Sequence, residues 1–176
     1  MPIESNSVQL LTACQSVHWF DLKKFFKEVD RVLSPNGVLA LFGYTMPDIS
    51  HKDFPNDKRV KNLCKKVYKN PSLIWSDDRR LVDEELTSIT LPFSDIIRRN
   101  DFEFVINASA EELKGYVLSW SAFNTLLKQS EGTAQQFLND VDFEIKNIFG
   151  DKTFDEIQLK IHFNYFLLMG RKAIIS

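Results

Sequence analysis

The sequence predicts an α/β fold built around a parallel sheet, and three consecutive segments near the N-terminus carry this prediction. Residues 8–14 form a mostly apolar run, residues 22–33 carry apolar side chains at helical spacing, and residues 38–43 form a second apolar run. Short apolar runs of this kind are typical of strands covered on both faces, which are usually parallel. A strand, a helix and a strand in this order predict a right-handed βαβ unit.

The helix of this unit has recognisable ends. Asp21 is a suitable N-cap. The helix is expected to stop before Pro35, where the chain reverses and Gly37 takes a positive φ. The apolar positions that repeat every three or four residues and define the buried face are Leu22, Phe25, Phe26, Val29 and Leu33.

The middle of the chain predicts less regular structure. Residues 45–56 are polar and turn-rich, which favours a long loop leaving the second strand. Residues 57–69 have apolar side chains at helical intervals and many lysines elsewhere, which predicts a surface helix with one buried stripe. Loop with short helical turns is expected around residues 74–80 and 92–93.

The last third predicts two further strands and two helices. Ser109 and Glu112 form a capping box ahead of a helix expected from about Ala110 to Lys128. The remaining predicted elements are a strand over residues 102–107, a helix from Gly132 to Gly150, and a buried strand over residues 157–169.

Composition restricts the function classes. The chain has 176 residues, 44% of them apolar, and a net charge of −2, which fits one globular domain without a basic surface for nucleic acid or an anionic membrane. There is neither a signal-peptide pattern nor a long apolar span. Cys14 and Cys64 show no paired spacing, which favours a reducing compartment. We therefore expect a cytoplasmic protein.

Familiar catalytic motifs are absent from the sequence. There is no GxSxG elbow, HExxH motif, phosphate-binding P-loop or GxGxxG fingerprint. His18, His51 and His162 are far apart and lack metal-ligand spacing, so no metal site is expected. Cys14 lies inside the predicted buried strand, where a thiol is more often an inert apolar group than a nucleophile.

Fold geometry indicates where a ligand would bind. In open parallel sheets, ligands bind beyond the carboxyl ends of the strands. The segments that follow the two predicted strands are residues 13–19 and 42–45. We expect the functional site there.

Two stretches in this part of the chain resemble a known family. Residues 8–21, which end in His-Trp-Phe-Asp, and residues 25–40, which contain Arg-Val-Leu-Ser-Pro-Asn-Gly-Val-Leu-Ala, are similar to class I S-adenosylmethionine-dependent methyltransferases. The methyltransferase type 11 subgroup that is similar to trans-aconitate methyltransferase shares three further patterns with this chain. These are residues 82–84, residues 91–93, and the Gly115-Tyr116 to Trp120-Phe123 stretch.

The resemblance implies a cofactor and a set of site residues. The cofactor would be S-adenosylmethionine, placed beside Ala13, Cys14, Gln15 and Trp19. Trp19 would face its sulfonium through a cation–π contact. His18 would serve as a general base or a polar clamp on the acceptor, with a structural histidine as the alternative.

The resemblance also implies an acceptor site. A small-molecule acceptor, of which a carboxylate is one example, would lie against Tyr44 and Trp120, although packing in the core or in a lid explains these two rings equally well. Gln15 fits a loop-bracing amide as well as a cofactor contact. The sequence does not name the acceptor, the atom methylated, a protein partner or the oligomeric state.

The chain departs from the family in one respect. Members have a glycine-rich loop after their first strand, and no such loop is present among the six scattered glycines. In this reading the chain is the C-terminal part of a Rossmann-like class I sheet, strands four to seven with helical lid insertions. The expected divisions are a strand–helix–strand core over 1–44, a loop and helix insertion over 45–100, and C-terminal strands and lid helices over 101–176.

Two function classes follow from this departure. The first is an incomplete methyltransferase that is inactive as an isolated chain. The second is a non-catalytic remnant that acts as a binding or regulatory subunit. Strand four is central in the family's sheet order, 3-2-1-4-5-7-6, so its outer edge is expected to be open here.

Overall fold

The computed structural model describes residues 2–173, which form two compact units. The first unit comprises residues 2–45, 77–102 and 164–173, and the second comprises residues 46–76 and 103–163. Strands β4 (Ser94–Ser109) and β5 (Gln158–Arg171) contribute residues to both units.

The sheet of the first unit is mixed. Strand β1 (Val8–Cys14) pairs in parallel with β2 (Leu33–Tyr44), as predicted, and places Leu11 opposite Leu39. Strand β2 pairs in the antiparallel sense with β5, and β4 also pairs with β5. Among the described residues β1 therefore stands at the end of the sheet, with β2 as its one partner strand.

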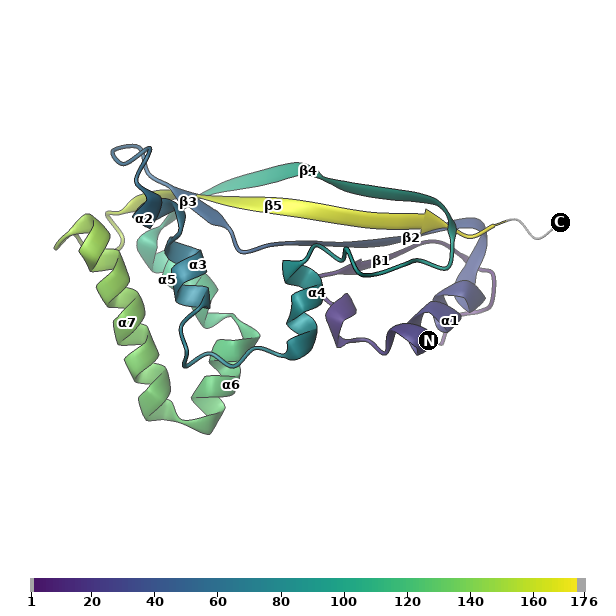
Figure 1. Cartoon of the computed structure of the whole chain (residues 1–176), viewed down its shortest axis with the longest axis horizontal. Helices are drawn as coiled ribbons and strands as arrows, with labels where there is room; N and C mark the ends of the chain where they lie inside the picture. The colour runs from purple at the N-terminus through teal and green to yellow at the C-terminus, as the bar shows by residue number, and fades with distance from the viewer. Residues whose placement is uncertain (1, 174–176) are drawn as a thin grey trace. The chain divides into compact units, whose positions relative to one another are not determined.

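The predicted helix between β1 and β2 is confirmed as α1 (Leu22–Val32). Its N-cap is Asp21, whose side chain accepts a hydrogen bond of 3.2 Å from the backbone N–H of Lys24. Figure 1 shows α1 on the same side of the strands as the short helix α4 (Arg80–Asp83). The buried residues between these helices and the strands include Val29, Leu33, Leu39, Leu41, Val82, Leu86 and Leu168.

The prediction that β1 is covered on both faces is wrong for the described chain. Ala13 is its one buried residue, and 58% of Leu10 is exposed to solvent. Cys14, which was expected to be buried, is also exposed. The reason is positional, because a strand at the end of a sheet has one neighbour where a central strand has two.

The turn before the second strand is also corrected. Asn36 takes the positive φ, at 65°, and Gly37 does not. Asparagine tolerates this conformation because its short polar side chain can bond locally. Gly37 is needed for space instead, since a Cβ there would lie 2.8 Å from the Ser34 carbonyl oxygen and 2.9 Å from that of Val8.

The second unit begins with a short strand inside the predicted loop. Strand β3 (Asp48–Ser50) pairs with β5 in the antiparallel sense, with Ile49 opposite Ile161. The predicted surface helix then follows as two pieces, α2 (Lys58–Lys61) and α3 (Leu63–Tyr68). Pairing with β5 explains the strand, which local sequence did not indicate.

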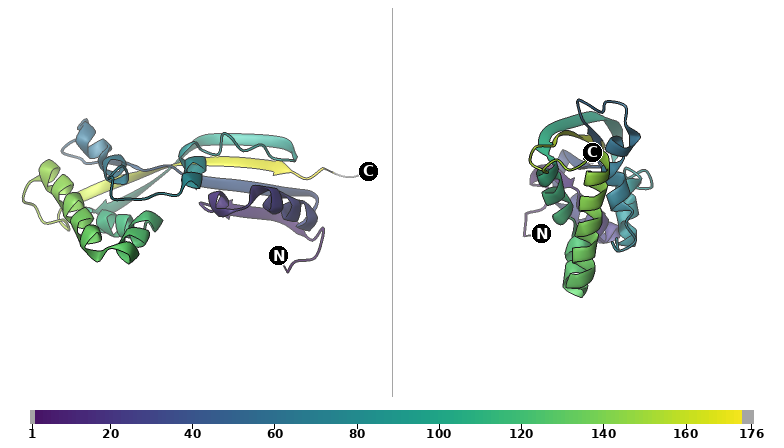
Figure 2. Two further views of the ribbon diagram at one scale, coloured as in Figure 1. Left: turned by 60° about the horizontal axis from the view of Figure 1, so that its bottom comes forward. Right: turned by 90° about the vertical axis from the view of Figure 1, so that its left-hand side faces the viewer.

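Three helices complete the second unit. The single helix predicted over residues 110–128 is divided into α5 (Ala110–Leu118) and α6 (Ser121–Gln129), while α7 (Glu131–Phe149) matches the predicted last helix. The capping box of Ser109 and Glu112 is confirmed, with bonds of 2.7 and 3.1 Å. Figure 2 shows α6 and α7 side by side, where they pack against each other.

None of the helices in residues 2–173 has the length and apolar character needed to cross a membrane.

Candidate functional site

The carboxyl ends of β1 and β2 lie next to each other, as the parallel sheet predicts. Cys14 is opposite Phe42, and the backbone N–H of Gln15 donates a 3.0 Å hydrogen bond to the carbonyl of Phe42. The side-chain amide of Gln15 donates a second bond, of 2.8 Å, to the carbonyl of Tyr44. The two segments that sequence singled out are thus joined at one edge of the sheet.

Gln15 is held in an uncommon conformation with one polar atom unused. Its φ is 48°, in the left-handed region that few side chains adopt without support. Its Oε1 is buried and has no hydrogen-bond partner. Gly43 leaves room for this side chain, because a Cβ at that position would lie 2.8 Å from Oε1. The bracing role of Gln15 and a free acceptor atom therefore occur in the same residue.

His18 lies in the short helix η1 (Val17–Trp19) that follows this edge. It is 4% exposed, and its Nδ1 is buried without a hydrogen-bond partner. Burial lowers the pKa of His18 below its ordinary value, and the Arg79 guanidinium lowers it further, while the carboxylates of Asp78 and Asp83 oppose the shift. The imidazole is consequently neutral at physiological pH and able to accept a proton.

Arg79 belongs to this site, although sequence spacing did not indicate it. It lies in η2 (Asp77–Arg79), which contacts η1, and its Nε is 3.4 Å from Asp83 Oδ1. The signal was absent because η1 and η2 are distant in sequence and no motif connects them. Their contact places a cationic and an acidic side chain beside the buried imidazole.

Trp19 and Cys14 are the exposed members of the site. The indole of Trp19 is 59% exposed, and its ring centroid lies 4.8 Å from that of His18. Although Cys14 is at the surface, neighbouring protein atoms exclude water from part of its thiol and raise the thiol's pKa. A raised pKa keeps the thiol protonated, which argues against a nucleophilic role.

The two aromatic residues predicted for the acceptor site occupy different units. Tyr44 lies in the first unit at the end of β2, where its ring centroid is 5.4 Å from that of Tyr165. Trp120 lies in the second unit, 6% exposed, and its indole N–H is buried without a partner. The rings around Trp120 belong to Tyr68, Trp75 and Tyr116, with centroids 6.1, 5.6 and 5.7 Å away.

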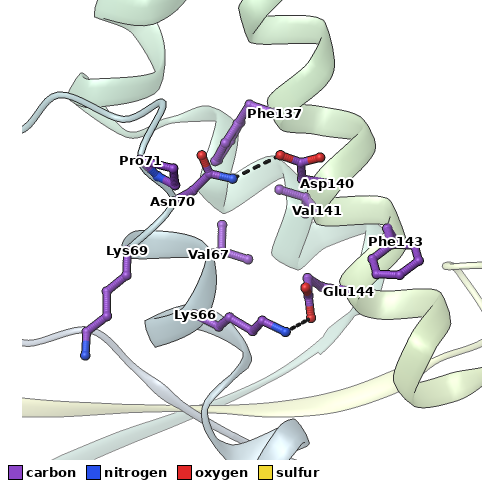
Figure 3. A pocket seen from close by; sticks show the side chains of 10 residues that line it. All are labelled: Lys66, Val67, Lys69, Asn70, Pro71, Phe137, Asp140, Val141, Phe143 and Glu144. Carbon is purple, nitrogen blue, oxygen red and sulfur yellow. Dashed lines mark hydrogen bonds and ion pairs between the residues drawn. The ribbon is translucent and has the colours of Figure 1, made fainter.

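A hollow of about 410 Å³ between α3 and α7 does not include any predicted site residue. Val67, Phe137 and Val141 are among its apolar lining residues (Figure 3). Its polar side chains bond to one another, with 2.7 Å between Lys66 Nζ and Glu144 Oε2, and 3.1 Å between Asn70 Nδ2 and Asp140 Oδ2. Because these groups are already paired, this hollow is a weaker candidate than the strand edge.

No cluster of three or more histidine, cysteine, aspartate or glutamate side chains suited to a metal ion occurs within residues 2–173.

Comparisons with known proteins agree with the strand-end geometry. Residues 1–41 match the family model described as a methyltransferase domain. A Dictyostelium discoideum protein named as a putative methyltransferase is 25% identical over 170 residues, which are 97% of this chain and 62% of that protein. The chain is class I methyltransferase-like.

Further relatives extend this likeness. A Saccharomyces cerevisiae protein named as a probable S-adenosylmethionine-dependent methyltransferase is 22% identical over 97% of this chain and 65% of its own length. The solved structure of a putative type II methyltransferase from Anaeromyxobacter dehalogenans shares the fold, with a TM-score of 0.67 and 21% identity over 98% of this chain and 68% of that one. The methyltransferase-like chain thus spans about two thirds or less of the curated relatives that it matches along its length.

Proposed function

We propose that this chain forms the acceptor-side part of an S-adenosylmethionine-dependent methyltransferase for small molecules. The observation that carries the proposal is the joined edge of β1 and β2, where Gln15 and His18 each present a buried polar atom without a partner. Buried polar atoms are usually hydrogen-bonded, so unsatisfied ones at a strand end indicate a bound ligand.

The cofactor fits the residues at this edge. The Oε1 of Gln15 and the Nδ1 of neutral His18 are hydrogen-bond acceptors, and S-adenosylmethionine carries ammonium and hydroxyl donors. The exposed face of Trp19 suits a sulfonium through a cation–π contact. Ala13 and Cys14 supply backbone at the same edge. When bound, the cofactor supplies an electrophilic methyl group.

In this proposal His18 acts on the acceptor. A buried, neutral imidazole removes a proton from an acceptor hydroxyl or amine, or holds a polar group in place without taking its proton. Methyl transfer needs little covalent assistance, so positioning in a pocket from which water is excluded provides much of the rate.

For the acceptor we propose a carboxylate, as in the subgroup similar to trans-aconitate methyltransferase. Trp120 supports this choice, because its buried indole N–H needs an acceptor atom and a carboxylate oxygen provides one. The rings of Tyr68, Trp75 and Tyr116 would surround the apolar part of the molecule. Tyr44 would contribute at the strand edge of the first unit.

We further propose that the cofactor site is incomplete without another polypeptide segment. Two observations support this: β1 has an open edge among the described residues, and the sequence has no glycine-rich loop to hold the methionine portion. A segment that pairs with β1 and brings such a loop would complete the site. The isolated chain is accordingly expected to be inactive.

Calorimetry tests the cofactor proposal. Titration of S-adenosylmethionine into the isolated chain should give no measurable binding, and a micromolar dissociation constant would overturn the claim of incompleteness. Sequencing of the transcript upstream of Met1 complements this test. An in-frame segment that encodes a strand and a GxGxG-like loop would support the enzyme, whereas a stop codon would favour a non-catalytic binding or regulatory subunit.

The acceptor proposal is tested separately with trans-aconitate as the probe. Trp120→Phe keeps an aromatic ring and removes the N–H, so affinity should fall about tenfold through loss of one hydrogen bond to a charged group. Trp75→Phe is the matched control, because the indole N–H of Trp75 already donates to the carbonyl of Tyr68. Equal affinity of wild type and Trp120→Phe would contradict the assignment.

A further inference from the structure

Three polar side chains from different strands of the second unit are joined by hydrogen bonds. The distance from Ser50 Oγ on β3 to His162 Nε2 on β5 is 2.8 Å. The distance from His162 Nδ1 to Glu103 Oε1 on β4 is 3.1 Å. A hydroxyl on one imidazole nitrogen and a carboxylate on the other is the arrangement that activates a serine nucleophile.

Strand register explains how these residues meet. His162 is opposite Asp48, so Ser50, two residues further along β3, lies on the same face of the sheet as His162. Strand β5 pairs with both β3 and β4, which brings Glu103 within reach of the imidazole. The alternate residues Leu159, Ile161 and Phe163 are buried, so the face that carries His162 is open to solvent.

The partners fix the direction of both hydrogen bonds in the neutral imidazole. A carboxylate can only accept, so Nδ1 of His162 carries the proton and donates to Glu103. Nε2 is then the acceptor, and Ser50 is the donor. This is the tautomer in which the histidine can remove the hydroxyl proton.

A hollow of about 430 Å³ adjoins Ser50. Lys52, Asn107 and Lys160 line it together with the serine, and Lys160 is opposite Ser50 in the strand register. The N–H groups of these side chains are suitable donors for the oxygen anion that forms during attack on a carbonyl. Two lysines also favour a substrate that carries negative charge.

We propose that Ser50, His162 and Glu103 form an acyl-transfer site, separate from the methyl-transfer function, that acts on small esters with an anionic acyl group. Ser50 Oγ bonds to the ester carbonyl carbon as its proton passes to His162 Nε2. The bond to the leaving oxygen then breaks, and that oxygen takes the proton from Nε2. Water, deprotonated by His162 in the same way, hydrolyses the acyl-serine to release the acid and restore Ser50.

Labelling with a fluorophosphonate probe tests this proposal. Ser50 Oγ would bond to phosphorus as fluoride leaves, and peptide mapping by mass spectrometry should locate the label on Ser50. Ser119 is an internal control, because its hydroxyl donates to the Tyr116 carbonyl and has no imidazole partner. A chain without label on Ser50, or with equal labelling of Ser119, would overturn the proposal.

Variants separate catalysis from packing. His162→Gln keeps a polar side chain but removes the base, so the labelling rate of Ser50 should fall about 100-fold or more. Glu103→Gln should have a smaller effect, about tenfold, because the Glu103 side chain is 52% exposed and water can replace part of its role. Circular dichroism checks that each variant is folded. An unchanged rate in a folded His162→Gln chain would contradict the assignment.

The substrate class has its own test. Hydrolysis of 4-nitrophenyl hydrogen succinate, which carries a carboxylate on its acyl group, should exceed that of 4-nitrophenyl acetate after correction for the uncatalysed rates. Lys160→Gln should reduce that preference. Equal rates for the two esters in the wild-type chain would overturn the anionic specificity.

Discussion

Strands β1 and β2 are parallel neighbours with similarly apolar sequences, yet they differ in burial. Leu39 and Leu41 of β2 are fully buried, whereas 58% of Leu10 in β1 is exposed. The difference follows from position, since β2 has a partner strand on each side and β1 has one. It teaches that an apolar pattern records the environment for which a strand is suited. In the described chain that environment is present for β2 and incomplete for β1.

The largest expected effect distinguishes the interiors of the two strands. Leu41→Ala in β2 should lower the free energy of unfolding by about 2–5 kcal/mol, because it removes a fully buried side chain and leaves a cavity. Leu10→Ala in β1 should change it by less than about 0.5 kcal/mol. Urea denaturation measures both. Equal losses would show that β1 is covered in solution.

A smaller effect is expected where the two strands end together. Gly43→Ala would place a Cβ 2.7 Å from the Phe166 ring and 2.8 Å from Gln15 Oε1, so one of them must move. The expected loss is about 1–3 kcal/mol of unfolding free energy. Gly115→Ala in α5 is the matched control, because its Cβ would meet nothing within 4 Å. A neutral Gly43→Ala would mean that the edge is loosely packed.

A pH effect should distinguish the exposed middle of β1 from the buried segment after it. Burial and Arg79 hold the pKa of His18 below the ordinary 6.5, so the unfolded chain binds a proton that the folded chain refuses. Stability should therefore decrease as pH falls through 6.5 toward the lower folded pKa. His18→Gln should flatten this dependence.

His51 is a useful comparison for that measurement. Burial lowers its pKa as well, so His51→Gln should flatten the profile independently. The double variant should be flatter than either single variant. A profile that His18→Gln leaves unchanged would contradict the burial of this imidazole.

Local sequence predicted the part of the fold that depends on local rules. The cap at Asp21, the capping box at Ser109 and the parallel pairing of β1 with β2 are confirmed. The end of α5 before Trp120 was missed because apolar side chains continue at helical spacing through the break. The burial of β1 was missed because burial depends on neighbouring strands.

The candidate sites show the same division. The strand ends that carry Gln15 and His18 were predictable, since the edge of a parallel sheet follows from chain direction. The group of Ser50, His162 and Glu103 was not, because the serine and histidine are separated by 112 residues and meet through strand pairing. Arg79 beside His18 was missed for the same reason.

The central claim is that β1 is an open edge in the isolated chain, suited to a partner segment. Hydrogen–deuterium exchange of peptides from β1 and β2 tests it most directly, because amides without a partner strand exchange quickly. We expect rapid exchange in residues 8–14 and slow exchange in residues 38–44. Protection of β1 equal to that of β2 would contradict the claim.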